Sequence, residues 1–118
     1  MRHLLLAALL ASAPVVPAAA HAILMSSQPA LRGTVPAGET RIVLRFNSRV
    51  DPARSQVALM RPDRAETPLP LEPGTAADTL AATATLAPGS YTLRWQVLAI
   101  DGHITHGSVP FTVQAAGA

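Results

Sequence analysis

The sequence contains no cysteine, no lysine and few aromatic residues, and these absences exclude several classes of protein. Without cysteine there is neither a disulfide framework nor a thiolate ligand, so packing must stabilise the fold and any metal site must use nitrogen and oxygen donors. One Trp, one Tyr and two Phe are too few aromatic rings for surfaces that stack bases or sugars. All the basic residues are arginines, which explains the high isoelectric point.

The first twenty residues differ in composition from the rest of the chain. Arg2 and His3 form a basic start, residues 4–10 are an unbroken run of Leu and Ala, and residues 18–20 provide a small-residue Ala-x-Ala site. This order predicts a secretory signal peptide over residues 1–20, cleaved at that site. The alternative is an uncleaved membrane anchor, but the apolar run is shorter than the roughly 20 residues that span a bilayer.

Cleavage there leaves residues 21–118, which are enough for one compact domain and too few for two. Eight arginines then stand against seven acidic residues, a formal charge of +1. A balance this close to zero gives no electrostatic footprint for nucleic acid. We therefore expect one secreted domain that acts as a monomer and has no nucleic-acid partner.

Apolar and polar residues alternate with a period of two along the mature chain, which predicts β-strands. The clearest case is residues 41–47, where Ile42, Leu44 and Phe46 face one way, and residues 90–98 repeat the pattern. About seven short strands separated by turn residues, in roughly 100 residues, predict an all-β, immunoglobulin-like Greek-key sandwich or barrel. The weaker strand candidates are residues 22–26, 56–60, 67–71, 79–86 and 108–113.

His21 becomes the amino terminus if the signal peptide is removed. An N-terminal histidine carries two nitrogen donors, its α-amine and ring Nδ1, which can close a six-membered chelate on a metal ion. Both groups titrate close enough to neutral pH to lose their protons to a strongly bound divalent ion. His21 alone therefore predicts two nitrogen ligands of a metal site.

The run Asp101-Gly102-His103 follows the strongest predicted strand. In extended backbone, side chains two residues apart share a face, so the Asp101 carboxylate and the His103 imidazole can converge on one ion while Gly102 leaves room. With His21 they supply three nitrogens and one oxygen, which suit Cu(II) in a tetragonal array, although zinc can use the same ligands. His106 is expected on the surface or in support of a ligand.

Several of these segments together resemble the CopC family of periplasmic copper-binding proteins. The resemblance rests on His21-Ala22 followed by Ser-Ser-Gln-Pro-Ala, on residues 44–47, and on Trp95 leading into Asp-Gly-His-Ile-Thr-His-Gly at residues 101–107. It implies a seven-stranded Greek-key fold and a Cu(II) site formed by His21, Asp101 and His103. It also implies a periplasmic protein that sequesters copper or delivers it to an inner-membrane copper transport protein.

Two features depart from the family pattern. Some members have an acidic residue near the copper just after the strand that ends in Phe46, where this chain has Asn47, Ser48 and Arg49. The methionine-rich segment of some members has no counterpart between residues 54 and 75. The chain thus resembles the members that bind only Cu(II).

Two other functions compete with a copper carrier. Polysaccharide monooxygenases also hold copper with an N-terminal histidine on an immunoglobulin-like core. This chain is short, lacks the extra loops and exposed aromatic residues of a carbohydrate-binding face, and places Asp101 where oxygen activation needs an open position, so we do not expect an enzyme. A metal-free structural sandwich becomes preferable if His21 is not the true terminus.

Overall fold

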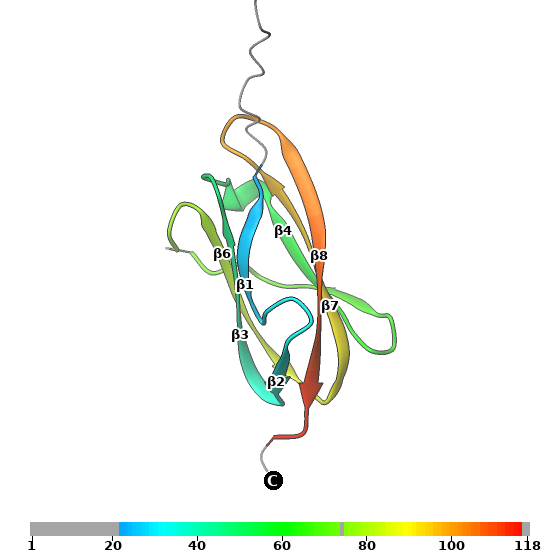
Figure 1. The fold of residues 1–118 in the computed structure, drawn as a ribbon. Coiled ribbons are helices and arrows are strands. Elements are labelled where there is room, and N and C mark those ends of the chain that lie inside the picture. Colours follow the sequence, from blue (N-terminus) through cyan, green and yellow to red (C-terminus); the bar gives the residue numbers. More distant parts are fainter. Residues whose placement is uncertain (1–21, 74, 117–118) are drawn as a thin grey trace, which may run out of the picture.

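The computed structural model describes residues 22–73 and 75–116, and the alternating stretches of the sequence form its strands (Figure 1). Side chains on alternate positions of the two clearest stretches are buried, as at Ile42, Leu44 and Phe46. A short 3-10 turn, Pro52–Arg54, is capped by the Asp51 carboxylate, which accepts a hydrogen bond from the backbone N–H of Ala53 over 3.0 Å. The strands are β1 (Leu24–Gln28), β2 (Thr34–Pro36), β3 (Gly38–Phe46), β4 (Gln56–Met60), β5 (Glu66–Pro68), β6 (Thr79–Leu86), β7 (Gly89–Leu98) and β8 (Ile104–Gln114).

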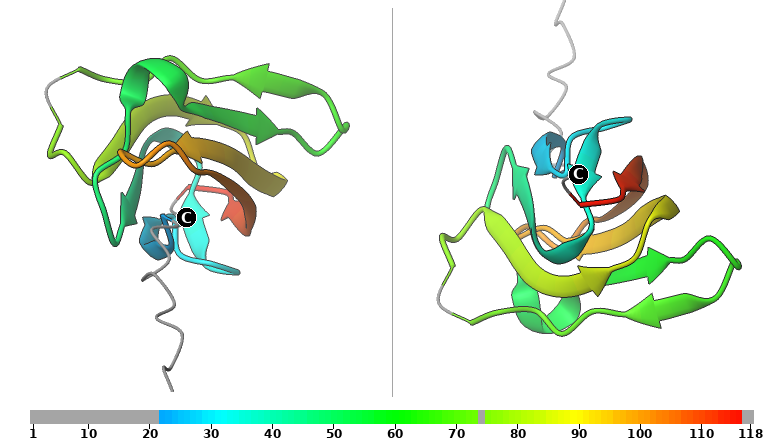
Figure 2. Two further views of the ribbon diagram at one scale, coloured as in Figure 1. Left: turned by 90° about the horizontal axis from the view of Figure 1, so that it is seen from above. Right: turned by 90° about the horizontal axis from the view of Figure 1, so that it is seen from below.

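The strands form two sheets that pack face to face (Figure 2). One sheet has the order β1-β3-β6 and the other the order β2-β8-β7-β4-β5. All pairings are antiparallel except that of β2 with β8. The predicted all-β sandwich is confirmed.

The observed strands differ from the predicted ones mainly at their ends. β4 and β6 coincide with the predicted residues, whereas β1 begins two residues later than predicted and β8 begins four residues earlier. β2 was not predicted, because three residues are too few to show an alternating pattern, and it brings the number of strands in the described residues to eight. Residue 21, the predicted start of the mature chain, lies outside the described residues.

The core lies between the two sheets and is built from the inward-facing side chains of both. Two aromatic pairs contribute to it: Phe46 meets Trp95 edge to face with ring centroids 5.1 Å apart, and Tyr91 stacks on Phe111 at 5.6 Å. Such pairs add to the stabilisation from buried area alone. Packing of this kind is what stabilises a chain that has no disulfide.

Gly107 is required by the close approach of an aromatic ring. It pairs with Trp95 across β7 and β8. A Cβ added at Gly107 would lie 2.5 Å from Cζ2 of that indole, which is closer than real contacts allow. Glycine at this position therefore lets the Trp95 ring lie against the backbone of β8.

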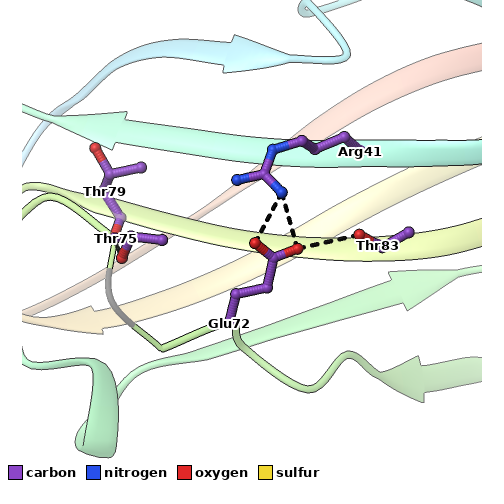
Figure 3. A network of polar contacts seen from close by, with 5 residues as sticks. All are labelled: Arg41, Glu72, Thr75, Thr79 and Thr83. Carbon is purple, nitrogen blue, oxygen red and sulfur yellow. Dashed lines mark hydrogen bonds and ion pairs between the residues drawn. The ribbon is translucent and has the colours of Figure 1, made fainter.

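A polar network fixes the connection between β5 and β6 on the outside of the three-stranded sheet (Figure 3). The Arg41 guanidinium donates to both carboxylate oxygens of Glu72 at 2.7 and 3.0 Å, and the Thr83 hydroxyl donates to the same carboxylate at 3.1 Å. The hydrogen bond from Arg41, followed by that from Thr83, lowers the pKa of Glu72. The network joins the connection to β3 and β6.

Among residues 22–73 and 75–116, no helix is long and apolar enough to cross a lipid bilayer.

Candidate metal centre

The turn between β7 and β8 carries two of the predicted ligands. The strands pair as far as Leu98 and Ile104, and beyond them the backbone N–H of Ala99 donates to the His103 carbonyl over 2.8 Å. Gly102 closes the turn by donating to the Ala99 carbonyl and has a φ of +93°, a conformation that favours glycine. Apart from its two chain neighbours, no described residue has an atom within 4 Å of a Cβ added there, so the positive φ is the local reason for glycine at this position.

Asp101 and His103 contact each other directly within this turn. Oδ2 of the carboxylate lies 2.7 Å from ring Nδ1 of His103, and Oδ1 accepts the backbone N–H of the same residue at 3.2 Å. The side chains are 27% and 58% exposed, respectively. The structure thus brings together two predicted site residues, on a tight turn instead of the extended backbone that was expected.

The hydrogen bonds in this pair favour the ionised form of the carboxylate. Desolvation raises the pKa of Asp101, but the hydrogen bonds from the ring and backbone of His103 together outweigh it, so the pKa lies below its usual value. An ionised carboxylate facing Nδ1 favours a proton on that nitrogen. The ionised carboxylate and the imidazole therefore form a hydrogen-bonded unit at the tip of the β7–β8 hairpin.

The first described residues of the chain are fastened beside this turn. The Thr105 hydroxyl donates to the carbonyl oxygen of Ala22 over 2.9 Å, and Ala22 is only 2% exposed. Asn47 holds the next residue at both ends, because its side-chain Oδ1 accepts the N–H of Ile23 at 2.8 Å and its own N–H donates to the Ile23 carbonyl at 3.0 Å. Residues 22 and 23 are thus fixed by one hydrogen bond from β8 and two hydrogen bonds with Asn47, the residue that follows β3.

The start of β1 and the β7–β8 turn lie at the same end of the sandwich (Figure 1). Thr105 pairs with the buried Val97, so it faces the interior, where Ala22 lies. His106 pairs with the exposed Gln96 and lies on the outer face of the five-stranded sheet. His103 and His106 therefore have different surroundings. In the described residues, the ring of His103 contacts Asp101, whereas His106 lies on the outer face of the sheet.

Within the described residues, no three His, Asp or Glu side chains cluster closely enough to hold a metal ion. Asp101 and His103 provide two donor groups, and the third predicted ligand, His21, lies outside the described residues. No carboxylate stands at residues 47–49. Met25 lies on β1 and Met60 on β4, in different sheets.

Comparison with known proteins places this architecture in a family. Residues 24–114 match the sequence model of the CopC domain. The chain belongs to the CopC family. The match includes Asp101, His103 and the anchoring residues Asn47 and Thr105, and it begins three residues after His21.

Solved structures of CopC proteins share the fold. CopC from Methylosinus trichosporium OB3b has 30% sequence identity and a TM-score of 0.72, over 83% of this chain and 98% of that chain. PcoC, a methionine rich copper resistance protein from Escherichia coli, has 26% identity and a TM-score of 0.67, over 80% and 99%. No curated protein matches the sequence.

Asn47 and Thr105 are structural parts of this end that the sequence did not predict. Asn47 stands at the end of a predicted strand and in the CopC-like pattern, where it takes the place of an acidic ligand, and Thr105 stands in the CopC-like motif, but these patterns give neither residue an anchoring role. A signal for Thr105 exists, because it is a polar residue at an inward-facing position of a strand, where an apolar side chain is usual. Nothing in the sequence indicates that its hydrogen-bond partner is the carbonyl of Ala22, 83 residues away.

Proposed function

We propose that the mature chain is a periplasmic protein that binds one Cu(II) ion at the end of the sandwich formed by the start of β1 and the β7–β8 turn. The ligands are the α-amine and ring Nδ1 of His21, the Asp101 carboxylate and the His103 imidazole. Copper is the cargo of this protein and not a catalyst. Membership of the CopC family and the likeness to a copper resistance protein support copper as the ion.

The observation that carries the proposal is the hydrogen bond from Thr105 to the carbonyl of Ala22. Ala22 directly follows His21, and consecutive Cα atoms are about 3.8 Å apart. Cleavage before His21 would create an α-amine within a residue or two of this anchor. His103 lies two residues before Thr105, in the turn that leads into β8. The new terminus would therefore lie close to the Asp101–His103 pair.

The Asp101–His103 pair suits a divalent cation. When Nδ1 donates to the carboxylate, the lone pair of the imidazole is on Nε2, and metal-binding histidines commonly donate their other nitrogen to a carboxylate in this way. Each carboxylate oxygen has two lone pairs, and His103 uses one on each, so Asp101 keeps acceptor capacity for a cation. Asp101 would both orient the imidazole and contribute an oxygen.

Nitrogen and oxygen donors favour Cu(II) over Cu(I), which prefers thiolates and thioethers. The chain has no cysteine, and its two methionines in the described residues lie in different sheets, which contrasts with the methionine rich PcoC. The protein would therefore keep copper in one oxidation state while it sequesters the ion or passes it to an inner-membrane copper transport protein. Secretion through the signal peptide at residues 1–20 would bring it to the periplasm.

The ligand set is tested with the mature protein, its terminus at His21 verified by mass spectrometry. One equivalent of Cu(II) is expected to give a tetragonal, nitrogen-rich EPR signal. His103→Ala should weaken binding more than about 100-fold, because loss of a ligand exceeds the 10–100-fold cost of losing a residue that supports one. His106→Ala is the matched control on the outer face and should change affinity by less than about twofold.

Equal effects of the two histidine substitutions would contradict the proposed site. Stoichiometric copper should also raise the melting temperature of the mature protein, because a ligand that binds only the folded state stabilises it. An unchanged melting temperature would favour the metal-free sandwich. Cells that lack the protein distinguish sequestration from delivery. A sequestering role predicts that these cells are sensitive to excess copper, whereas a delivery role predicts that they take up less copper when copper is scarce.

A further inference from the structure

A groove of about 580 Å³ lies on the outer face of the five-stranded sheet, at the end away from the metal centre. Figure 2 shows the β1–β2 connection and the β4–β5 hairpin on either side of β7 and β8. Arg32 reaches the groove from the first of these segments, and Arg61 and Arg64 reach it from the second. The hydroxyl-bearing residues Ser90, Thr92 and Thr112 line it between them.

The charges of this groove are not balanced within the described part of the chain. None of its lining residues is acidic, and Arg32, Arg61 and Arg64 form no ion pair with a described carboxylate. Arg61 donates through Nε to the Thr67 hydroxyl at 3.2 Å, and the nearby Asp63 carboxylate accepts the backbone N–H of Ala65. By contrast, four other arginines each face a carboxylate, in the pairs Arg41–Glu72, Arg45–Asp78, Arg54–Asp51 and Arg94–Glu66.

Two of the groove arginines are in a backbone conformation that side chains rarely adopt. Arg32 has a φ of +59° and Arg64 a φ of +74°, and they are the only residues other than glycine with positive φ in the described chain. Turns that need this conformation usually contain glycine or asparagine. Backbone hydrogen bonds hold both arginines, from Arg32 to the Pro110 carbonyl at 2.7 Å and from Arg64 to the Arg61 carbonyl at 2.8 Å. Turn formation alone does not explain arginine at these positions.

We propose that this groove binds an acidic, extended segment of a partner protein. The groove crosses the three neighbouring strands β8, β7 and β4, which are spaced about 4.8 Å apart. The distance across these strands matches the length of about three residues of extended peptide. Carboxylates of such a segment would pair with the three arginines, since guanidinium groups match carboxylates in geometry as well as charge. The hydroxyls between them can bond the backbone of the segment. The concave shape between two loops favours a narrow chain over the flat surface of a membrane.

The groove is far from the metal centre. Experiments can therefore contradict the proposed copper site without contradicting the proposed peptide groove, and the reverse. The Ser90–Thr112 pair lies eight residues along β7 from the Leu98–Ile104 pair at the turn, roughly 27 Å at the rise of an antiparallel strand. Changes in the groove should leave the Cu(II) EPR signal unchanged. Loss of copper binding on substitution of His103 should likewise leave the groove intact.

The proposal is tested by fluorescence anisotropy with a labelled octapeptide in which Asp and Gly alternate, and with the same peptide carrying Asn for Asp. The protein should bind the Asp peptide and not the Asn peptide, and binding should weaken as salt is raised. Arg61→Gln should weaken it about tenfold, the expected cost of a charged hydrogen bond, and the triple variant R32Q/R61Q/R64Q should abolish it. Arg49→Gln is the matched control, because Arg49 is an exposed arginine outside the groove that also lacks an ion pair with a described carboxylate.

Several results would overturn the proposal. One is equal binding of the Asp and Asn peptides, and another is an equal effect of the Arg49 and Arg61 substitutions, which would indicate net charge alone. Binding of phosphatidylglycerol vesicles, lost in the triple variant while the Asp peptide does not bind, would assign the arginines to a membrane surface. Self-association that the triple variant abolishes, without peptide binding, would assign them to a second copy of the chain. Melting curves show whether each variant is folded.

Discussion

Replacement of Thr105 by valine removes the hydroxyl that anchors Ala22 while it keeps the shape and β-branching of the side chain. The lost hydrogen bond is 2.9 Å long, and the residue that it holds is 2% exposed, so water is poorly placed to replace the hydroxyl. Leaving a buried acceptor without its partner costs about 1–3 kcal/mol. If this anchor holds the chain terminus beside His103, a loss of about 1.4 kcal/mol in the copper complex corresponds to about tenfold weaker binding.

The assay is competition for Cu(II) against a chelator of known affinity, with the mature Thr105→Val protein and the parent compared at one pH. Thr112→Val is the control, because Thr112 is exposed on the same strand and donates no hydrogen bond through its side chain within the described residues. We expect Thr105→Val to bind copper about tenfold more weakly and Thr112→Val to bind like the parent. Equal affinities for all three proteins, even with a lower melting temperature for Thr105→Val, would show that the anchor is only structural and would refute the reasoning.

Three further substitutions test the packing and the polar contacts around the core. Gly107→Ala should destabilise the fold by about 1–3 kcal/mol, because the added methyl group overlaps the Trp95 ring, and a urea midpoint equal to that of the parent would contradict this packing. Asn47→Leu should lower both the melting temperature and the affinity for copper, because it removes the acceptor for the Ile23 N–H. Copper affinity equal to that of the parent would show that this contact does not contribute to the metal centre. Glu72→Gln should lower the melting temperature at neutral pH. Because the folded-state pKa of Glu72 is depressed, this difference should persist above the ordinary value of 4.5 and disappear as the pH falls through the folded-state value; a difference that does not change with pH would contradict the role of charge.

Much of the fold could be predicted because alternation along one strand is a local signal. Apart from Val43 and Leu98, residues 41–47 and 90–98 alternate between polar and apolar. All of these residues except Asn47 lie in the long strands β3 and β7. The early start of β8 could not be predicted, since Thr105 and Gly107 occupy inward-facing positions where the pattern calls for apolar side chains. These exceptions have long-range causes: Thr105 holds the start of the chain, and Gly107 admits the indole of Trp95.

The candidate site could be predicted only where its residues are close in sequence. Asp101 and His103 are two residues apart, and in the structure their side chains lie 2.7 Å from each other. The relation between the start of the chain and the β7–β8 turn depends on a contact across 83 residues, which no single segment encodes. The ligand roles of His21, Asp101 and His103 stay predictions, and His21 lies outside the described residues.

The most direct test of the proposed copper site is the affinity for Cu(II) of the mature protein with and without one glycine added before His21. The added residue converts the α-amine of His21 into a peptide N–H and leaves Asp101, His103 and the fold unchanged. The chelate account predicts strongly weakened binding and an altered EPR signal for the extended protein. Equal affinity and an identical signal for the two proteins would contradict it.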